Sequence, residues 1–238
     1  MVTRIKLKLF IFLFFGFFLR MIGADFERIQ KADSLFEAQK YTEAFAMYGE
    51  IIEKESFSSS MLLKMAFIQD ASGDHAEALY YLDLYYRASA DRQAVGKIEE
   101  LANTHELRGY QYDDTDYFLA LLAKYRVSIV LLLLAFSIVT LTYIYIKYRQ
   151  GLRVFIPFIF QVFISSLLII VLNISPSSKA IITVNQTLLR SGPSAGAEPI
   201  DVIEKGHKVT ILNYSDVWAK ILWNGSEVFV RNNRLKII

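Results

Sequence analysis

The sequence predicts a multidomain protein in which an all-α helical repeat is followed by a two-helix transmembrane hairpin and then by a small all-β barrel. Three observations lead to this fold class. Small residues recur at an offset of 34 residues in the first half of the chain. Two apolar runs, each of about 20 residues, lie back to back in the middle. Short β-branched segments separated by turn residues fill residues 180–238.

The N-terminus has the layout of a secretory signal peptide. Three basic residues precede the apolar stretch Leu9–Leu19, and Met21–Ala24 ends in small residues. We therefore expect residues 1–24 to be a signal peptide that is cleaved after Ala24, and the chain beyond it to be exported. Because Arg20 places a charge late in the apolar stretch, an uncleaved anchor is the alternative.

A helical repeat is expected over residues 25–124. Ala32 and Ala66 are 34 residues apart, and so are Ala44 and Ala78. Small residues at two points in each repeat allow paired antiparallel helices to pack closely. The fixed offset therefore predicts two copies of one helical hairpin.

Two more helices are expected after this pair. One covers Asp91–Glu106, and the other begins over Asp113–Lys124 and runs on into the first apolar run. Residues 25–124 carry 19 acidic and 10 basic side chains. This balance argues against nucleic-acid binding, because phosphate groups require clustered lysine and arginine.

The repeat resembles the tetratricopeptide (TPR) family. Ala32–Tyr48 looks like a TPR helix–turn–helix, and a second copy runs from Ala66 to Leu82 with the expected glycine, Gly73, in its turn. The sequence departs from the family at Gln39, where the first copy should have that glycine, and at Ser56, where a proline usually ends the repeat. A generic helical hairpin is the alternative interpretation.

The TPR resemblance implies a groove on the concave face, formed by the first helix of each repeat, that holds a peptide or a partner helix. The groove candidates are Ile29, Asp33, Phe36, Glu37, Leu63, Phe67 and Asp70. In the TPR subtype that clamps a C-terminal carboxylate, lysine and asparagine stand where this chain has Ile29 and Asp33, so we expect no such clamp. An acidic and aromatic groove suits a basic or amphipathic protein segment. Ordinary core packing of the aromatic residues is the alternative.

The central apolar runs, Val127–Ile146 and Val154–Leu172, contain no Asp, Glu, Lys or Arg. Each is about long enough to cross the ~30 Å hydrocarbon layer of a membrane as a helix. The turn between them, residues 147–153, carries three basic residues and no acid, which assigns it to the cytoplasm by the positive-inside rule. A two-span hairpin returns the chain to its starting side, so residues 25–124 and 180–238 should both be exported.

The C-terminal segment, residues 180–238, reads as a small barrel. Expected strands are Ile181–Thr187, Val209–Leu212, Trp218–Trp223 and Val228–Val230. Asn224-Gly225 is a type I′ hairpin signal. Several short strands in so few residues indicate a closed all-β barrel.

The barrel resembles the bacterial SH3-like (SH3b) family. Its motifs are recognisable in Leu189–Ser194, Glu204–Leu212, Val217–Ile221 and Asn224–Val230. The resemblance implies binding to cell-wall peptides or to another protein. It also implies that Trp218 lies in the core, which leaves Trp223 as the expected contact residue on the barrel surface.

Signals of catalysis are missing. The chain has no cysteine, and its three histidines are scattered singly, so no metal site is expected. His75 and His207 are expected to be solvated. No phosphate-binding glycine loop or catalytic triad is visible. We therefore expect a protein that is not an enzyme and uses no cofactor.

The order of the segments is similar to that of proteins encoded in bacterial Bat (aerotolerance) operons. This resemblance implies a complex at the bacterial cytoplasmic (inner) membrane, with the soluble modules facing the periplasm or the cell exterior. We expect a scaffold whose TPR groove binds a protein and whose barrel binds peptidoglycan or a protein. The alternative function is an envelope sensor that reports cell-wall or stress state through the membrane hairpin.

Overall fold

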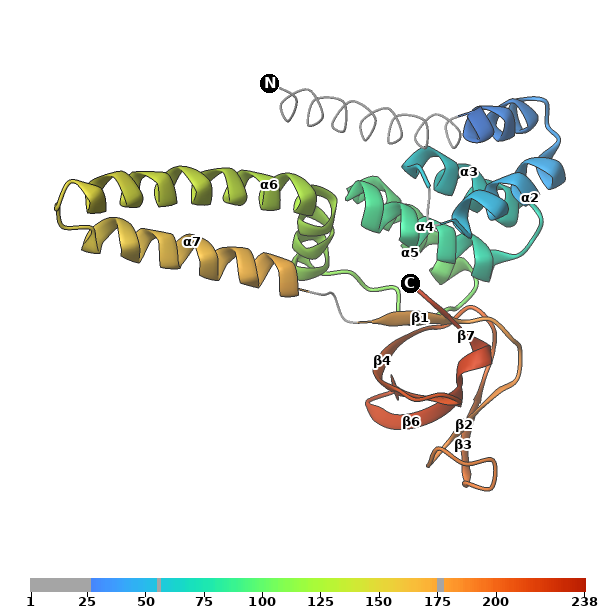
Figure 1. Cartoon of the computed structure of the whole chain (residues 1–238). Coiled ribbons are helices and arrows are strands. Elements are labelled where there is room, and N and C mark those ends of the chain that lie inside the picture. Colours follow the sequence, from blue (N-terminus) through green and yellow to red (C-terminus); the bar gives the residue numbers. More distant parts are fainter. Residues whose placement is uncertain (1–26, 55–56, 175–177) are drawn as a thin grey trace, which may run out of the picture. The chain divides into compact units, whose positions relative to one another are not determined.

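The computed structural model describes residues 27–54, 57–174 and 178–238 (Figure 1). The signal peptide expected at residues 1–24 lies outside the described residues. The chain divides into two compact units, Met1–Leu82 and Asp83–Ile238.

The first unit is built of short helices. Its helices cover residues 27–37, α2 (Tyr41–Ile52), α3 (Ser59–Ala71) and the first part of α4 (His75–Ser89). The helix α4 continues into the second unit. The side chain of Ser58 caps the start of α3 by accepting a hydrogen bond from the N–H group of Met61 (3.2 Å).

Two turns of the first unit repeat each other at an offset of 34 residues. Gln39 (φ 60°) and Gly73 (φ 84°) both adopt the left-handed conformation. The residue after each, Lys40 and Asp74, donates its N–H to a carbonyl oxygen five residues earlier, at 2.9 Å in both turns. This is the Schellman arrangement that ends many helices. The first turn therefore forms without the glycine that the second turn has.

The small residues that defined the repeat in the sequence are the ones on which the helices pack. Ala32, Ala44, Ala66 and Ala78 are all buried. Larger side chains complete the core around them, among them Tyr48, Met61, Leu62, Met65 and Leu79. A methyl side chain at these four positions lets neighbouring helix backbones approach. A larger side chain there would push the helices apart.

The second unit contains three more helices, α5 (Arg92–Thr104), α6 (Asp114–Arg149) and α7 (Phe155–Asn173). The carboxylate of Asp91 caps α5 by accepting from the N–H of Gln93 (2.9 Å). Asp113 accepts from the N–H of Asp116 (2.8 Å) and forms a capping box with it at the start of α6. The helices expected at Asp91–Glu106 and from Asp113 onward are thus confirmed.

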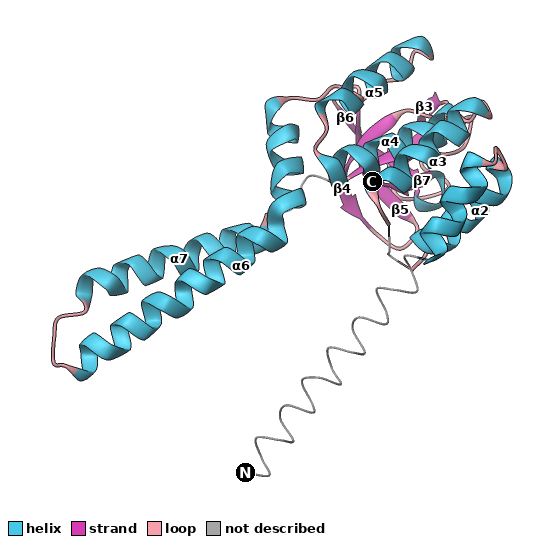
Figure 2. Ribbon diagram, turned by 90° about the horizontal axis from the view of Figure 1, so that it is seen from above, coloured by secondary structure: helices cyan, strands magenta, loops and turns pink. Residues whose placement is uncertain are grey.

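The helices α6 and α7 lie side by side as a hairpin (Figures 1 and 2). Both are long and apolar enough to cross a membrane, as judged by length and composition. Most of their side chains point outward: of the residues in these two helices, those that are buried are Ala120, Gln161 and Ile164.

The buried Gln161 joins the two helices of the hairpin through polar contacts. Its Nε2 donates to the hydroxyl of Ser137 on α6 (2.8 Å) and lies 3.3 Å from the hydroxyl of Ser165 on α7. Its Oε1 accepts a hydrogen bond from the hydroxyl of Thr140 on α6. Gln161 on α7 is therefore hydrogen-bonded across the α6–α7 interface to two polar side chains of α6, Ser137 and Thr140.

The C-terminal part is an antiparallel sheet that curls around its own core (Figures 1 and 2). Its strands are β1 (Lys179–Ile182), β2 (Thr187–Arg190), β3 (Pro199–Ile203), β4 (Lys208–Tyr214), β5 (Trp218–Trp223), β6 (Ser226–Arg231) and β7 (Leu235–Ile237), and a 3-10 turn, η1 (Asn232–Arg234), precedes β7. Their spatial order is β3-β2-β6-β5-β4-β1-β7. The core consists of inward side chains from six strands, with Leu189, Ile221 and Val230 fully enclosed.

One of the predicted strands is wrong and two strands were not foreseen. The expected strand Ile181–Thr187 is two strands, because the chain turns at Gln186, which has φ 50°. The turn is held by the side-chain oxygen of Asn185, which accepts from the N–H of Lys205 (3.2 Å). A run of β-branched residues does not reveal such a turn when the contact that holds it comes from a distant segment. The strands β3 and β7 are the unforeseen ones.

The hairpin between β5 and β6 forms as expected. Trp223 pairs with Ser226, so Asn224 and Gly225 are the two residues of the turn. Both have positive φ angles, 49° and 77°. This is the geometry of a type I′ turn, whose twist matches that of the flanking strands.

Candidate binding surfaces

Three aromatic rings gather on the first unit. The ring centroid of Phe36 lies 5.4 Å from that of Tyr41 and 5.8 Å from that of Phe67, and the Tyr41 and Phe67 centroids are 5.9 Å apart. All three pairs meet edge to face, a favourable arrangement for aromatic rings. Phe67 is nevertheless 53% exposed, and Leu63, one helical turn earlier on α3, is 45% exposed. The cluster therefore presents apolar surface to solvent.

Lys64 lies beside this aromatic cluster and forms ion pairs with two acidic residues next to it. Its Nζ is 3.0 Å from Oδ1 of Asp33 and 3.9 Å from Oε1 of Glu37. It also lies 5.2 Å from the centroid of the Phe36 ring. Lys64 is not one of the expected groove residues, and its charge makes this surface less acidic than those residues alone indicate.

Asp33 is held from a second side by Tyr48, whose hydroxyl donates to Oδ1 at 2.5 Å. Burial raises the pKa of Tyr48 well above its ordinary value, and the hydrogen bond to Asp33 adds to this effect. Tyr48 is therefore a permanent donor to the carboxylate. Asp33 is oriented by its neighbours and is only partly open to a ligand.

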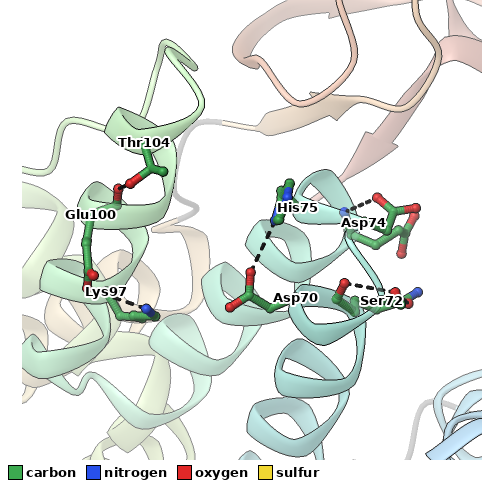
Figure 3. Close-up of polar contacts among 9 residues, drawn as sticks. Asp70, Ser72, Asp74, His75, Lys97, Glu100 and Thr104 are labelled. Carbon is green, nitrogen blue, oxygen red and sulfur yellow. Dashed lines mark hydrogen bonds and ion pairs between the residues drawn. The ribbon is translucent and has the colours of Figure 1, made fainter.

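The other expected groove residues lie at the ends of this surface. Ile29 is partly buried one helical turn before Asp33. Asp70 lies near the C-terminus of α3, where its carboxylate is 3.2 Å from Nδ1 of His75 (Figure 3). His75, expected to be solvated, is instead partly buried at the start of α4 and paired with Asp70. The structure thus brings Asp33, Phe36, Glu37 and Phe67 together around Lys64.

The remaining contacts in Figure 3 are local helix contacts. Asp74 accepts from the N–H of Glu77 (3.1 Å), and the hydroxyl of Ser72 donates to the carbonyl of Gln69 (2.9 Å). On α5, the Lys97 ammonium lies 3.4 Å from Glu100. Such exposed pairs three residues apart contribute little to stability and do not indicate a site.

The burial expected for the two tryptophans is reversed. Trp223, expected on the surface, is 8% exposed, and its Nε1 donates to Oδ2 of Asp201 (2.9 Å). Trp218, expected in the core, is only partly buried on the outer face of β5. Alternation along β5 explains the reversal, since Trp223 shares the inward phase of Ala219 and Ile221. The alternation of β5 is already present in the sequence, whereas the expected burial of the two tryptophans followed the family resemblance.

A cavity of about 170 Å³ opens on the sheet beside Trp218. It is lined by Gln186, Thr187, Leu188, Arg190, Trp218, Arg231 and Arg234. The guanidinium group of Arg231 lies 5.6 Å from the centroid of the Trp218 ring. None of these residues was expected to form a site, and Trp218 was expected to lie in the core.

The segment between α5 and α6 lies along β4. The N–H of Lys208 donates to the carbonyl of Arg108 (2.9 Å), and the hydroxyl of Tyr110 donates to the carbonyl of Gly206 (2.6 Å). Gly109 has φ 92°, and a side chain there would meet the carbonyl oxygen of Lys208 at 2.0 Å. Only glycine allows this close approach. A loop that the sequence left unassigned is therefore part of the packing of the barrel.

His207 is part of this contact and is not solvated as expected. Its Nδ1 accepts from the N–H of Arg108 (3.0 Å), and its ring lies 5.2 Å from that of Trp223. Burial lowers the pKa of His207, the nearby Arg108 lowers it further, and Glu204 opposes them. The neutral imidazole is thus the form that fits this position.

No metal site is visible in the part of the chain that the structure describes. Within residues 27–54, 57–174 and 178–238, no three His, Cys, Asp or Glu side chains are grouped so as to hold a metal ion.

The curled sheet belongs to a known class of domain. Residues 187–236 match the bacterial SH3 domain family, so the chain contains an SH3b domain that runs from β2 into β7. The strand β1 precedes the matched residues but pairs with both β4 and β7, and it completes the sheet. Comparison of the whole chain with curated proteins gives no match.

Proposed function

We propose that the chain is a non-enzymatic, membrane-anchored scaffold of the bacterial envelope. The observation that carries this proposal is the SH3b domain at residues 187–236, a type of domain that binds cell wall or protein, in the same chain as two helices long enough to span a membrane. In the sequence, the helical unit precedes the hairpin formed by α6 and α7, and the barrel follows it. Each soluble part then supplies one binding surface, and the hairpin keeps both close to the membrane.

The helical unit is proposed to be a TPR array. Its support is the repeated turn at Gln39 and Gly73, together with the buried alanines at the same offset. The exposed Phe67 ring of the aromatic cluster and the partly neutralised acids around Lys64 suit an amphipathic partner helix that carries an occasional basic residue. In this proposal the partner packs its apolar face on Phe67 and Leu63.

Both soluble parts are proposed to face the exported side of the inner membrane. Lys147 and Arg149 in the last turn of α6, and Arg153 just before α7, make this end of the hairpin basic, with no acid, which favours a cytoplasmic location for it. Reporter fusions after Ala90, Gln150 and Ile238 should then read outside, inside and outside. A cytoplasmic signal at Ile238 would contradict the topology.

Partner binding is tested with the full chain purified from bacterial membranes under mild detergent. Phe67→Ala removes an exposed ring of the aromatic cluster, whereas Phe118→Ala removes a similarly exposed ring from α6. We expect Phe67→Ala to lose proteins that the parent chain captures, and Phe118→Ala to retain them. If both variants capture the same proteins as the parent chain, the groove does not bind the partner.

A further inference from the structure

The cavity beside Trp218 is lined by cationic side chains from three different elements. Arg190 lies on β2, Arg231 ends β6, and Arg234 belongs to η1. All three line the same space of about 170 Å³. A space of this size admits a carboxylate side chain and a few atoms beside it, and is small for a nucleotide or a sugar chain.

The positive charge of this cavity is not neutralised by neighbouring acids. Among the described residues, none of the three guanidinium groups forms an ion pair with a carboxylate, and none of the lining residues is acidic. Glu204 accepts a hydrogen bond from the backbone N–H of Gln186 (3.3 Å), which is one of the lining residues, and forms no ion pair with the three arginines. By contrast, Lys220 on the same strand as Trp218 is paired with Glu227. Unpaired arginines therefore distinguish this cavity from the rest of the outer face.

The arginines are also oriented. One N–H of Arg190 donates to the carbonyl of Ala197 (2.6 Å), which anchors the side chain and leaves most of its five donors unused. Arg231 lies against the ring of Trp218. A planar guanidinium held in this way can present two parallel N–H groups to a carboxylate.

Apolar surface adjoins the charged groups. Trp218 is partly exposed on the outer face of β5, and Leu188 is exposed on β2. Tryptophan and arginine are both enriched among the residues that contribute most to binding at the centres of protein interfaces. A ligand that offers both carboxylates and apolar side chains would use every part of this surface.

We propose that this cavity is the docking site for an acidic peptide segment, whose Asp or Glu carboxylates are bound by Arg190, Arg231 and Arg234 beside Trp218. The inference rests on the proposed function of the barrel as a recognition module, and it names the chemistry of that module's ligand. It predicts binding that weakens as salt is raised, because exposed charges are screened at high ionic strength.

The test uses the full chain in detergent micelles and a fluorescein-labelled hexaglutamate peptide, with binding followed by fluorescence anisotropy. Arg231→Gln and Arg234→Gln should each weaken binding about tenfold, since each removes a charge-assisted hydrogen bond. Arg149→Gln, which removes the same charge from the C-terminal end of α6, should leave binding unchanged. Labelled hexalysine should not bind to the cavity.

Two results would overturn the proposal. One is an equal loss of hexaglutamate binding in Arg149→Gln, which would show attraction by net charge alone. The other is inorganic phosphate displacing the peptide at lower concentration than unlabelled hexaglutamate, which would make phosphate groups the ligand. Binding to purified peptidoglycan separates this inference from the proposed function. If the parent chain binds peptidoglycan but its binding of hexaglutamate does not depend on Arg231 or Arg234, the barrel is still a recognition module and this cavity is not an acidic-peptide site.

Discussion

The Nζ atom of Lys208 lies 2.9 Å from Oδ2 of Asp83, and both side chains are almost completely buried, with 2% and 1% exposure. The hydroxyl of Tyr112 donates to Oδ1 of Asp83 (2.6 Å) and accepts from Nζ of Lys208 (3.0 Å). Burial lowers the pKa of Lys208, and the charge of Asp83 opposes that shift. The ion pair connects α4 to β4, and each charge is tolerated there because the other is present.

Removing one partner of this pair should destabilise the second unit more than removing both. Lys208→Met leaves the Asp83 carboxylate buried without a counter-ion, so we expect a loss of about 3–5 kcal/mol in the free energy of unfolding. The double variant Asp83→Leu/Lys208→Met should recover most of that loss. Denaturant titration of the full chain in detergent measures both.

The control for this experiment is Lys220→Met. Its partner Glu227 is largely exposed, so the loss should be at most about 1 kcal/mol. If the losses from Asp83→Leu and Lys208→Met simply add in the double variant, the two charges do not stabilise each other.

Stability should fall in mildly acidic solution because of His207. Its pKa in the folded state is lower than its ordinary value of 6.5, so below about pH 6.5 the unfolded chain binds the proton more readily than the folded chain. The contribution is fully present above pH 6.5 and is lost as the pH falls through the lowered pKa. Protonation would also turn Nδ1 from an acceptor into a donor facing the N–H of Arg108.

The measurement is the melting temperature of the full chain between pH 7.5 and pH 5. The variant His207→Gln should flatten the dependence, whereas the exposed His105→Gln should leave it as in the parent chain. An identical slope in His207→Gln and the parent would assign the effect to other groups.

The two tryptophans should respond oppositely to truncation. Trp223→Ala empties a buried position in the barrel core and should cost about 3–5 kcal/mol. Trp218→Ala removes a ring from the outer face and should leave the fold intact. Near-ultraviolet circular dichroism with denaturant titration distinguishes the two. A barrel that unfolds more readily with Trp218→Ala than with Trp223→Ala would contradict the burial described above.

Gln161 should stabilise the α6–α7 hairpin modestly. Gln161→Leu removes its hydrogen bonds to Ser137 and Thr140, and such bonds between membrane helices contribute on average about 0.6 kcal/mol and at most about 1.7 kcal/mol. Unfolding in mixed micelles of increasing SDS fraction gives the value. Thr142→Val is the control, because Thr142 bonds only within its own helix, to the carbonyl of Ile138 (2.8 Å). Equal stability of Gln161→Leu and the parent would mean that apolar packing alone holds the hairpin.

The repeat depends on its small buried residues. Ala44→Leu or Ala78→Leu should cost about 1–3 kcal/mol through overpacking. Ala46→Leu lies on the exposed side of α2 and should change little. Hydrogen exchange of residues 27–82 in the full chain reports the local opening free energy. Faster hydrogen exchange in Ala46→Leu than in Ala44→Leu would mean that position 46 is the tightly packed one, and the register of the repeat described above would be wrong.

Local signals in the sequence determined a large part of this protein. Two uninterrupted apolar runs were enough to predict α6 and α7, because a helix of that length and composition needs no partner to be recognised. Asp91 and Asp113 marked the starts of α5 and α6 because a cap acts on the backbone next to it. Asn224-Gly225 marked the β5–β6 hairpin because these two residues themselves adopt the positive φ angles that the turn requires.

Contacts between distant segments were decided only by the tertiary structure. The turn at Gln186 depends on Asn185 reaching Lys205, the burial of His207 depends on Arg108, and Asp83 meets Lys208 across more than a hundred residues. Trp218, Arg190, Arg231 and Arg234 line one cavity although they come from four separate elements. Alternation and capping are encoded within a few residues, whereas a cavity or a buried ion pair exists only once the strands and helices that carry its parts have packed.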